Sequence, residues 1–390
     1  MNPYYFSISI EGDFIDSFIY SGTLFLVHAS SKITTHNWEN LLSSHFEKNT
    51  PAESMRTFQF LKDCRRTLAM ENRPQLNIHI PKEALHENCT FTLHMNGWPT
   101  DINVFANRLY LADENGVEEL PFIWESKQID AANRFKIWNK YAYKISPNDA
   151  HRLAIAAGQN GVISATPRSG YINEKEDILT LLEVDSHDCE WIGRRLISNS
   201  SQGAFLSTFP DLPNKPSANI TDDFWNQFNM ARREPPTTTK LSYQGDSSAI
   251  YSWEGGDKIF SLLHGGSILI QYMDEATGPS FQGQNFQTKK VDLSEELSLS
   301  KGILAARSGL FGTVIEAGDH LFTLTKDGID RISTRPVSWR VFPRAKNYLN
   351  HLHVVERDRL LIQAYIPQLS VEKADTFGMH IKEEASSFDD

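Results

Sequence analysis

Residues 302–333 carry the pattern that most restricts how this chain can fold, because short apolar segments alternate there with two tight turns. The turns are Gly-Asp at 318–319 and Asp-Gly at 327–328, and apolar residues alternate with polar ones on either side. An Asp-Gly pair supplies the positive φ angles that a two-residue hairpin needs, and alternation gives each strand one buried face. The pattern predicts three short antiparallel strands, a β-meander.

Segments of the same kind recur along the 390 residues. They lie at residues 17–35, 102–120, 152–166, 178–184 with 191–209, 249–272, 302–333, and 337–342 with 351–367. Each segment forms a small antiparallel sheet that cannot bury both of its faces alone, so several sheets must pack together. Radial packing of such sheets makes a β-propeller. We therefore predict an all-β fold, a single β-propeller of about seven antiparallel blades.

The first strand of the chain has no neighbour in the sequence. Residues Tyr4–Ile10 alternate apolar and polar side chains, but no hairpin partner stands next to them. The seventh segment, at the other end of the chain, ends after three strands. A strand without neighbours and a blade without an outer strand can complete each other through main-chain hydrogen bonds. We expect the N-terminal strand to complete the last blade and so to close the ring.

In its rhythm of short strands and turns, the chain resembles the WD40-like β-propeller class over about four-fifths of its length. The Trp-Asp dipeptide that closes a WD40 blade and the Gly-His dipeptide that opens one do not occur. The resemblance therefore implies a propeller fold and carries over no functional residues. A pair of β-sandwich domains is the competing fold, because it also joins short strands with turns.

Two stretches interrupt the strand pattern. Between residues 39 and 72 the apolar spacing changes to three or four residues after a Thr-Pro-Ala-Glu start, so a helical insertion is expected, with its helix over 51–70. Residues 210–236 are rich in Pro, Asn, Asp and Thr, and they predict an irregular surface loop with a short helix near 222–230.

The remaining boundaries follow from these elements. Residues 126–138 have mixed character and favour a short helix. We expect residues 1–367 to form the propeller with its insertions. The polar and acidic residues 368–390 are expected to form a tail that is partly disordered.

Composition excludes some functions. The formal net charge of −11 argues against general nucleic-acid binding, which needs clustered basic residues. No apolar run approaches the roughly 18 residues of a membrane span, and the first residues lack the basic and apolar regions of a secretory signal. Cys64, Cys89 and Cys189 lie far apart without a CxxC pair, which is typical of reduced thiols. We expect a cytoplasmic protein that binds neither membranes nor nucleic acid.

Two clusters contain side chains that can bind metals. Residues 185–190, Asp-Ser-His-Asp-Cys-Glu, hold four ligand types but only one Cys and one His, so a solvated turn is the preferred interpretation. His351 and His353 alternate on a predicted strand and share a face, where Asp358 or His320 would have to join them as a third ligand. The pattern is more typical of packed or surface histidines. We predict no metal site and no cofactor.

Motifs of the common catalytic folds do not occur: there is no G-x-S-x-G nucleophile elbow, no G-x-x-x-x-G-K-[ST] phosphate loop and no G-x-G-x-x-G fingerprint. We therefore predict no catalytic residues. Triads assembled from distant positions leave an enzyme open as the alternative. That alternative is a hydrolase or lyase with an active site at the propeller axis, for which His151, His264 and Glu316 are the candidates.

Basic pairs and tryptophans near loops are the candidates for partner binding. They are Arg65, Arg66, Trp98, Trp225, Arg232 and Arg233. Trp and Arg are enriched among interface anchors, and binding residues concentrate on loops held by rigid elements. Solvated charge and packing between blades are the alternatives. The predicted function is a cytosolic protein–protein interaction module, a regulatory or inhibitory subunit that acts on a separate effector protein.

Overall fold

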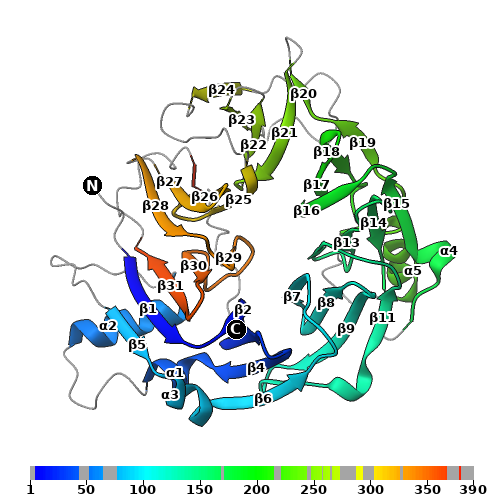
Figure 1. Ribbon diagram of the computed structural model, residues 1–390. Coiled ribbons are helices and arrows are strands. Elements are labelled where there is room, and N and C mark those ends of the chain that lie inside the picture. Colours follow the sequence, from blue (N-terminus) through cyan, green and yellow to red (C-terminus); the bar gives the residue numbers. More distant parts are fainter. Residues whose placement is uncertain are drawn as a thin grey trace. The chain divides into compact units, whose positions relative to one another are not determined.

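Seven sheets of mainly antiparallel strands make up the computed structural model, which has the β-propeller fold (Figure 1). It describes residues 5–43, 52–64, 77–167, 171–214, 221–243, 247–256, 258–263, 266–272, 287–292, 303–325, 328–366 and 377–378. The predicted all-β propeller of about seven blades is confirmed. Two β-sandwich domains are the wrong alternative, because the chain runs through seven successive sheets of four or five strands.

Residue contacts divide the chain into two compact units. The first unit contains residues 1–92, 253–260 and 266–390. The second contains residues 93–252 and 261–265. No helix in the described part of the chain is long and apolar enough to cross a membrane.

The first sheet of the first unit begins at the second strand of the chain. Its strands are β2 (Phe14–Tyr20), β3 (Thr23–His28), β4 (Lys32–Asn37) and β6 (Cys89–His94). The β2–β3 hairpin turns at Ser21 and Gly22, whose φ angles of 45° and 71° suit a two-residue turn with two positive φ angles. The last two residues of β6 belong to the second unit.

An insertion with three helices separates β4 from β6. Its elements are α1 (Trp38–Ser43), α2 (Ala52–Lys62), β5 (Asn77–Ile80) and α3 (Lys82–Glu87). Helices α1 and α2 lie where the helical spacing predicted an insertion, and residues 65–72 of that prediction lie outside the described residues. Trp38 is fully buried, and its Nε1 donates a 3.1 Å hydrogen bond to the carbonyl oxygen of Leu61. This bond ties α1 to the end of α2.

The last sheet joins the two ends of the described chain. Its strands are β29 (Ser338–Val341), β30 (His351–Val355), β31 (Arg359–Tyr365), β1 (Tyr5–Glu11) and β5. Strand β1 pairs antiparallel with β31 over seven residues, from Tyr5 opposite Tyr365 to Glu11 opposite Arg359 (Figure 1). The N-terminal strand therefore completes the last blade, as predicted. The parallel pairing of β5 with the outer side of β1 was not predicted.

Two further sheets involve the first unit. One consists of β25 (Ile303–Gly309), β26 (Gly312–Ala317), β27 (His320–Thr325) and β28 (Gly328–Thr334). It has one strand more than predicted, because the segment before the Gly312 turn is also extended. The other sheet has residues in each of the two divisions of the chain. It consists of β20 (Ser242–Tyr243), β21 (Ser247–Glu254), β22 (Lys258–Leu263), β23 (Ser267–Tyr272) and β24 (Gln287–Asp292).

Two residues of the predicted C-terminal tail are described, and both are held by the first unit. The Phe377 ring stacks on Phe260 at 6.1 Å between centroids. Thr313 Oγ1 donates a 2.9 Å hydrogen bond to the Phe377 carbonyl, and the buried Lys258 Nζ donates a 3.1 Å bond to the Gly378 carbonyl. The rest of the tail that was predicted to be partly disordered lies outside the described residues.

The second unit contains three complete sheets. The first consists of β7 (Asp101–Phe105), β8 (Arg108–Asp113), β9 (Gly116–Ile123), β10 (Gln128–Ile129) and β11 (Phe135–Trp138). The second consists of β12 (Lys144–Pro147), β13 (Leu153–Ala156), β14 (Val162–Ala165) and β15 (Ile178–Leu182), with α4 (Glu174–Asp177) before its last strand. The third consists of β16 (Ser186–Ile192), β17 (Arg195–Ser200), β18 (Gly203–Thr208) and β19 (Thr237–Lys240), with α5 (Asp222–Ala231) before its last strand.

Three local predictions in this unit are wrong. The helix expected over 126–138 is two strands and a 3₁₀ turn, because β10 and β11 both pair with β9. Residues 178–184 contain the outer strand of the preceding sheet rather than part of the fourth segment. The solvated turn expected at 185–190 is mostly strand β16, in which Asp188 and Cys189 are buried.

All three cysteines are described, and none forms a disulfide. Cys64 and Cys189 are buried, and Cys89 is half-buried. That the three thiols are reduced stays a prediction.

Candidate functional site

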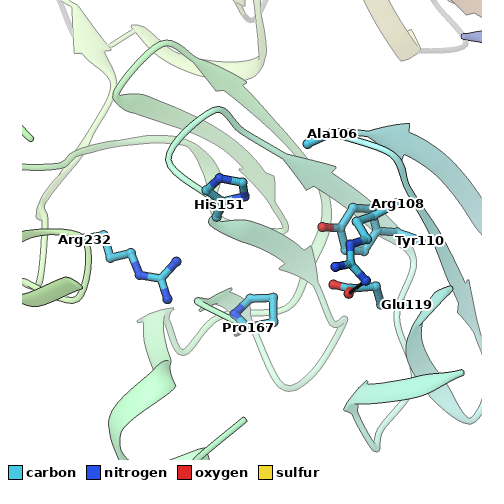
Figure 2. A pocket seen from close by; sticks show the side chains of 7 residues that line it. All are labelled: Ala106, Arg108, Tyr110, Glu119, His151, Pro167 and Arg232. Atoms are coloured by element: carbon cyan, nitrogen blue, oxygen red, sulfur yellow. Dashed lines mark ion pairs between the residues drawn. The ribbon is translucent and has the colours of Figure 1, made fainter. Parts of the chain in front are cut away.

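A pocket of about 270 Å³ lies within the second unit (Figure 2). Seven residues line it: Ala106, Arg108, Tyr110, Glu119, His151, Pro167 and Arg232. Two arginines, a glutamate, a histidine and a tyrosine give this lining five polar side chains. Pockets for drug-sized ligands usually start at about 300 Å³, so this one suits a small chemical group.

One wall of the pocket is the β8–β9 hairpin. Side chains two residues apart on a strand share a face, so Arg108 and Tyr110 of β8 both turn toward the pocket. Glu119 of β9 stands opposite Tyr110 in the antiparallel register. The Nη1 atom of Arg108 lies 3.1 Å from Oε1 of Glu119, and the Tyr110 hydroxyl hydrogen-bonds the same carboxylate. Figure 2 shows the three side chains grouped on this wall.

Burial controls the electrostatics of this wall. The Glu119 side chain is only 6% exposed, and loss of hydration raises the pKa of its carboxyl group. Arg108 and the Tyr110 hydrogen bond oppose that rise, because both stabilise the charged form. Burial, followed by the nearby charge of Glu119, raises the pKa of Tyr110, so its hydroxyl stays protonated and can donate. Glu119 therefore serves to hold both neighbours in place.

His151 reaches the pocket from the turn between β12 and β13. The Asn148 side chain fixes this turn, since its Oδ1 accepts hydrogen bonds of 3.1 Å from the Ala150 amide and 3.0 Å from the Arg152 amide. His151 itself has a φ of 53°, a left-handed conformation that is uncommon for a residue other than glycine. Burial and then the charge of Arg232 lower the pKa of His151, so its ring is neutral at neutral pH.

Behind the pocket, Arg152 connects β13 to the end of helix α5. Its side chain is fully buried and lies over the Phe209 ring, with 4.4 Å between the guanidinium carbon and the ring centroid. Nε donates a 2.8 Å hydrogen bond to the Arg232 carbonyl, and Nη2 donates one of 3.3 Å to the Ala231 carbonyl. Burial, followed by the charge of Arg232, lowers the pKa of Arg152 to about 10, so the group remains charged at neutral pH.

The predicted basic pair Arg232-Arg233 divides between two environments. Arg232 is the C-cap residue of α5, is only 5% exposed, and faces the β8–β9 wall from the opposite side of the pocket (Figure 2). Nη2 of Arg233 lies 2.6 Å from Oδ1 of Asp177, whose side chain is completely buried. The two arginines are thus held by the fold, and their predicted role in partner binding stays a prediction.

Helix α5 presents an aromatic surface, which we define by Phe224, Trp225 and Phe228. None of the ten residues of α5 is fully buried; Trp225 is 47% exposed, and Phe224 and Phe228 are half-buried. Met230, which is 70% exposed, lies on another side of the helix. The rings of Phe224, Trp225 and Phe228 contact one another at centroid distances of 5.4, 5.8 and 6.0 Å. Trp225, predicted as a partner contact, belongs to this surface.

The other predicted partner contacts are separate from it in the sequence. Trp98 is 60% exposed in the connection between β6 and β7. Arg65 and Arg66 lie outside the described residues. The predicted role of Trp98, Arg65 and Arg66 in partner binding therefore stays a prediction.

The candidates for the enzyme alternative have different environments. His151 lines the pocket of the second unit, while Glu316 lies on β26 of the first unit, where it accepts a 2.8 Å hydrogen bond from Trp339 Nε1. His264 lies outside the described residues. Within the described ranges no group of three His, Cys, Asp or Glu side chains is placed to bind a metal ion. His351 and His353 are fully buried, and His353 Nδ1 lies 2.9 Å from Ser17 Oγ.

Arg108, Tyr110, Glu119 and Arg152 were not predicted to belong to a site. One signal could have found three of them: the Asn115-Gly116 turn predicts a hairpin in which residues 108, 110 and 119 share one face. The observed hairpin turns one residue earlier, with Asp113 opposite Gly116, and so places Tyr110 opposite Glu119. A charged Glu on the buried face of such a strand requires a partner, and Arg108 is within reach. No comparable signal points to Arg152, because its partners are carbonyls at the end of a distant helix.

Comparisons with known proteins place the fold. No protein-family model matches the sequence, and no curated protein matches it. The solved structure of BBS1N in complex with ARL6DN is similar with a TM-score of 0.50 at 7% identity, over 95% of this chain and 99% of that chain. Sqt1 of Saccharomyces cerevisiae gives a TM-score of 0.46 at 8% identity, over 89% of this chain and 82% of that one.

A third structure is described as a β-propeller domain. It is that of Cps50 (Swd1) from Myceliophteria thermophila, with a TM-score of 0.41 and 11% identity, covering 69% of this chain and 98% of that chain. At such identities likeness concerns the fold alone. The function must therefore be argued from the surfaces of this chain itself.

Proposed function

We propose that this protein is a protein–protein interaction module and that the aromatic surface of α5 is its docking site. The observation that carries the proposal is a ten-residue helix that holds an exposed tryptophan against two half-buried phenylalanines. Aromatic side chains exposed to water lose the hydrophobic stabilisation that burial gives, and a partner surface restores it. Trp is also among the residues that most often dominate interface energies.

The helix is prepared for docking because both of its ends are fixed. At the first turn, Thr221 Oγ1 accepts a 3.3 Å hydrogen bond from the Phe224 amide. At the last turn, Arg152 binds two helix carbonyls, and Arg233 pairs with Asp177. An isolated helix of ten residues would be marginal in water, so these anchors maintain it. A surface that is already ordered loses less entropy when it binds.

The chemistry of the surface specifies its partner. An amphipathic helix with aromatic anchors fits an apolar groove on a folded protein. Asp222 and Asp223 are exposed in the first turn of α5, so the rim of that groove should be basic next to the helix N-terminus. The occupant we propose is therefore a separate protein with an apolar groove and a basic rim.

The finer proposal is that the chain is a regulatory or inhibitory subunit that acts on an effector protein in the cytoplasm. Its support is an analogy at the level of fold, because rigid scaffolds with docking surfaces often act through the proteins that they bind. Three free thiols favour a reducing compartment. Measurement of the activity of a purified partner with and without this chain tests the regulatory role, and an unchanged activity contradicts it.

The docking site is tested with matched substitutions. A photo-crosslinking residue at position 229, one turn after Trp225 on the same side of α5, identifies the protein that contacts this surface in the full-length chain. The affinity of that protein is then measured with purified components. W225A should weaken binding by at least about tenfold, the typical effect of removing an interface anchor. W124A is the control, because Trp124 is also exposed, at 49%, in the same unit but outside α5. Equal affinity of W225A and wild type would overturn the proposal.

A further inference from the structure

The pocket of the second unit has two guanidinium groups on opposite walls. Arg108 enters from β8 and Arg232 enters from the end of α5 (Figure 2). Each arginine has a separate support. The guanidinium group of Arg108 is held by Glu119 at 3.1 Å, and the backbone of Arg232 is held by Arg152 at 2.8 Å. Both arginine side chains line the same pocket.

The charges of the lining do not balance. Of the seven lining residues, two carry a permanent positive charge and only Glu119 carries a carboxylate. Arg152 adds a further positive charge directly behind Arg232, and the proximity of these two guanidinium groups helps to lower the pKa of Arg152. Two more carboxylates, Asp149 and Glu234, act on Arg152 from exposed positions, where water screens them. An anion in the pocket would relieve this repulsion.

The positions of the donors indicate the shape of that anion. A planar carboxylate can be satisfied by a single guanidinium group, whereas a tetrahedral oxyanion has oxygens that point toward several walls. Here potential donors stand on three sides: Arg108, Arg232, and the ring of His151 above them (Figure 2). The volume of about 270 Å³ holds a group of phosphate size with a short attachment rather than a large ligand.

We propose that this pocket binds a phosphate monoester between Arg108 and Arg232. His151 contributes a ring nitrogen from the third wall, and Glu119 positions Arg108 without contacting the phosphate. The monoester belongs either to a small phosphorylated metabolite or to a phosphorylated side chain of a protein. The site goes beyond the docking surface of α5 and stands whether or not α5 binds a partner.

The first test uses inorganic phosphate with the full-length chain. Phosphate should raise the thermal midpoint and bind in calorimetry at constant ionic strength, while acetate should do neither. R232Q removes one cation, and R108Q/E119Q removes the opposite cation together with its carboxylate, so that no unpaired buried charge remains. Each should weaken phosphate binding by at least about tenfold, the effect of losing one charge-assisted hydrogen bond.

Matched controls separate binding from folding. R335Q changes an arginine that is 79% exposed in the first unit and paired with Asp319, so it should bind phosphate like wild type. R232K keeps the charge but loses the planar fork, and it should bind with intermediate affinity. It also keeps the test decisive if R232Q proves unstable. Phosphate affinity unchanged in R232K, R232Q and R108Q/E119Q, or acetate binding as tight as phosphate, overturns the proposal.

Two further probes distinguish the source of the monoester. The first is a library of phosphoserine peptides, whose affinities are compared with that of capped phosphoserine. The second is a set of sugar phosphates. Peptides that bind at least about tenfold tighter than capped phosphoserine assign the site to a phosphorylated protein, because flanking residues add contacts. Sugar phosphates that bind tighter than every peptide assign it to a metabolite. In both cases R232Q should abolish the tighter binding of the peptides or of the sugar phosphates.

Discussion

The Nε atom of Arg152 donates a 2.8 Å hydrogen bond to the carbonyl oxygen of Arg232, and this bond joins a propeller strand to the end of helix α5. The same guanidinium group binds the Ala231 carbonyl and lies over the Phe209 ring. The last carbonyls of a helix have no partner within the helix, and a cation there also interacts well with the helix dipole. One buried side chain therefore supports both the docking surface and one wall of the pocket.

Substitution of Arg152 should destabilise the protein strongly. R152M can still pack on the Phe209 ring but removes the donor to the Arg232 carbonyl and leaves the Ala231 carbonyl with the 3.3 Å bond from the Glu234 amide. We expect a loss of about 2–4 kcal/mol in the free energy of unfolding, measured by urea denaturation. Amide hydrogen exchange across residues 222–232 should rise as well. R134M is the control, since its pair with Glu118 is 3.3 Å long and partly exposed, and it should cost under about 1 kcal/mol.

Truncation of a core side chain in β1 tests whether the N-terminal strand supports the last blade. Ile8 is fully buried and pairs with Ile362 of β31 on one side and Ile78 of β5 on the other. I8A should cost about 2–5 kcal/mol in the free energy of unfolding, from lost burial and the cavity that remains. S9A, at the next and less buried position, should stay within about 1 kcal/mol of wild type. Similar losses for the two variants would show that β1 is not part of the core.

Much of the fold could be predicted from the sequence because its signals are local. Gly-containing turns such as Asn115-Gly116 define hairpins, and alternation defines which strand face is buried. The pairing of β1 with β31 was also predictable, since one end of the chain had a strand without neighbours and the other end had a blade without an outer strand. The parallel pairing of β5 with β1 carried no such signal. The apolar pattern around Ile78 predicts a strand but does not indicate which strand it pairs with.

The candidate site was harder to predict because it depends on distant contacts. Glu119 and Arg108 lie on the same face of one hairpin, which the sequence predicts, although the observed pairing is shifted from the one that a turn at Asn115-Gly116 would give. Arg232 enters the pocket only because Arg152 holds the end of α5 against another blade. From sequence, Arg232 and Arg233 look like one exposed basic pair, yet the fold buries the first and pairs the second with Asp177. Side-chain direction at a helix end is set by what the helix packs on.

Buried histidines should make the protein sensitive to acid. Burial lowers the pKa of His351 to about 3, and it lowers that of His353 well below its ordinary value. The unfolded chain protonates these rings as the pH falls below about 6.5, whereas the folded protein does not, so stability is lost as the pH drops from about 6.5 toward the folded pKa. Between pH 7 and pH 5 each fully buried ring should cost about 2 kcal/mol, measured by urea denaturation at each pH.

His351 is the better of the two histidines to substitute. Neither of its ring nitrogens has a hydrogen-bond partner within the described structure, so H351L removes a titrating group without breaking a hydrogen bond. The variant should lose less stability between pH 7 and pH 5 than wild type does. An identical pH dependence in H351L and wild type would contradict the assigned cause.

Alanine substitutions at two glycines allow the cost of backbone strain to be told apart from the cost of a steric clash. Gly161, in the β13–β14 turn, has a φ of 77°, and a Cβ atom added there would lie 1.8 Å from the Leu182 carbonyl oxygen. Gly193, in the β16–β17 turn, has a φ of 53°, and an added Cβ would meet nothing within 4 Å. Both alanine variants carry the cost of a left-handed residue, about 1–2 kcal/mol. Only in G161A must the chain at Leu182 also move, to make room for the added Cβ atom.

We therefore expect G193A to lose about 1–2 kcal/mol and G161A to lose more than about 3 kcal/mol in the free energy of unfolding. The difference between them measures how firmly the chain at Leu182 is held against the β13–β14 turn. Urea denaturation of both variants gives this difference directly, with the slope of the transition showing whether the folded state remains compact. Equal losses would mean that the end of β15 gives way easily, and that the outer strand of this blade is only loosely attached.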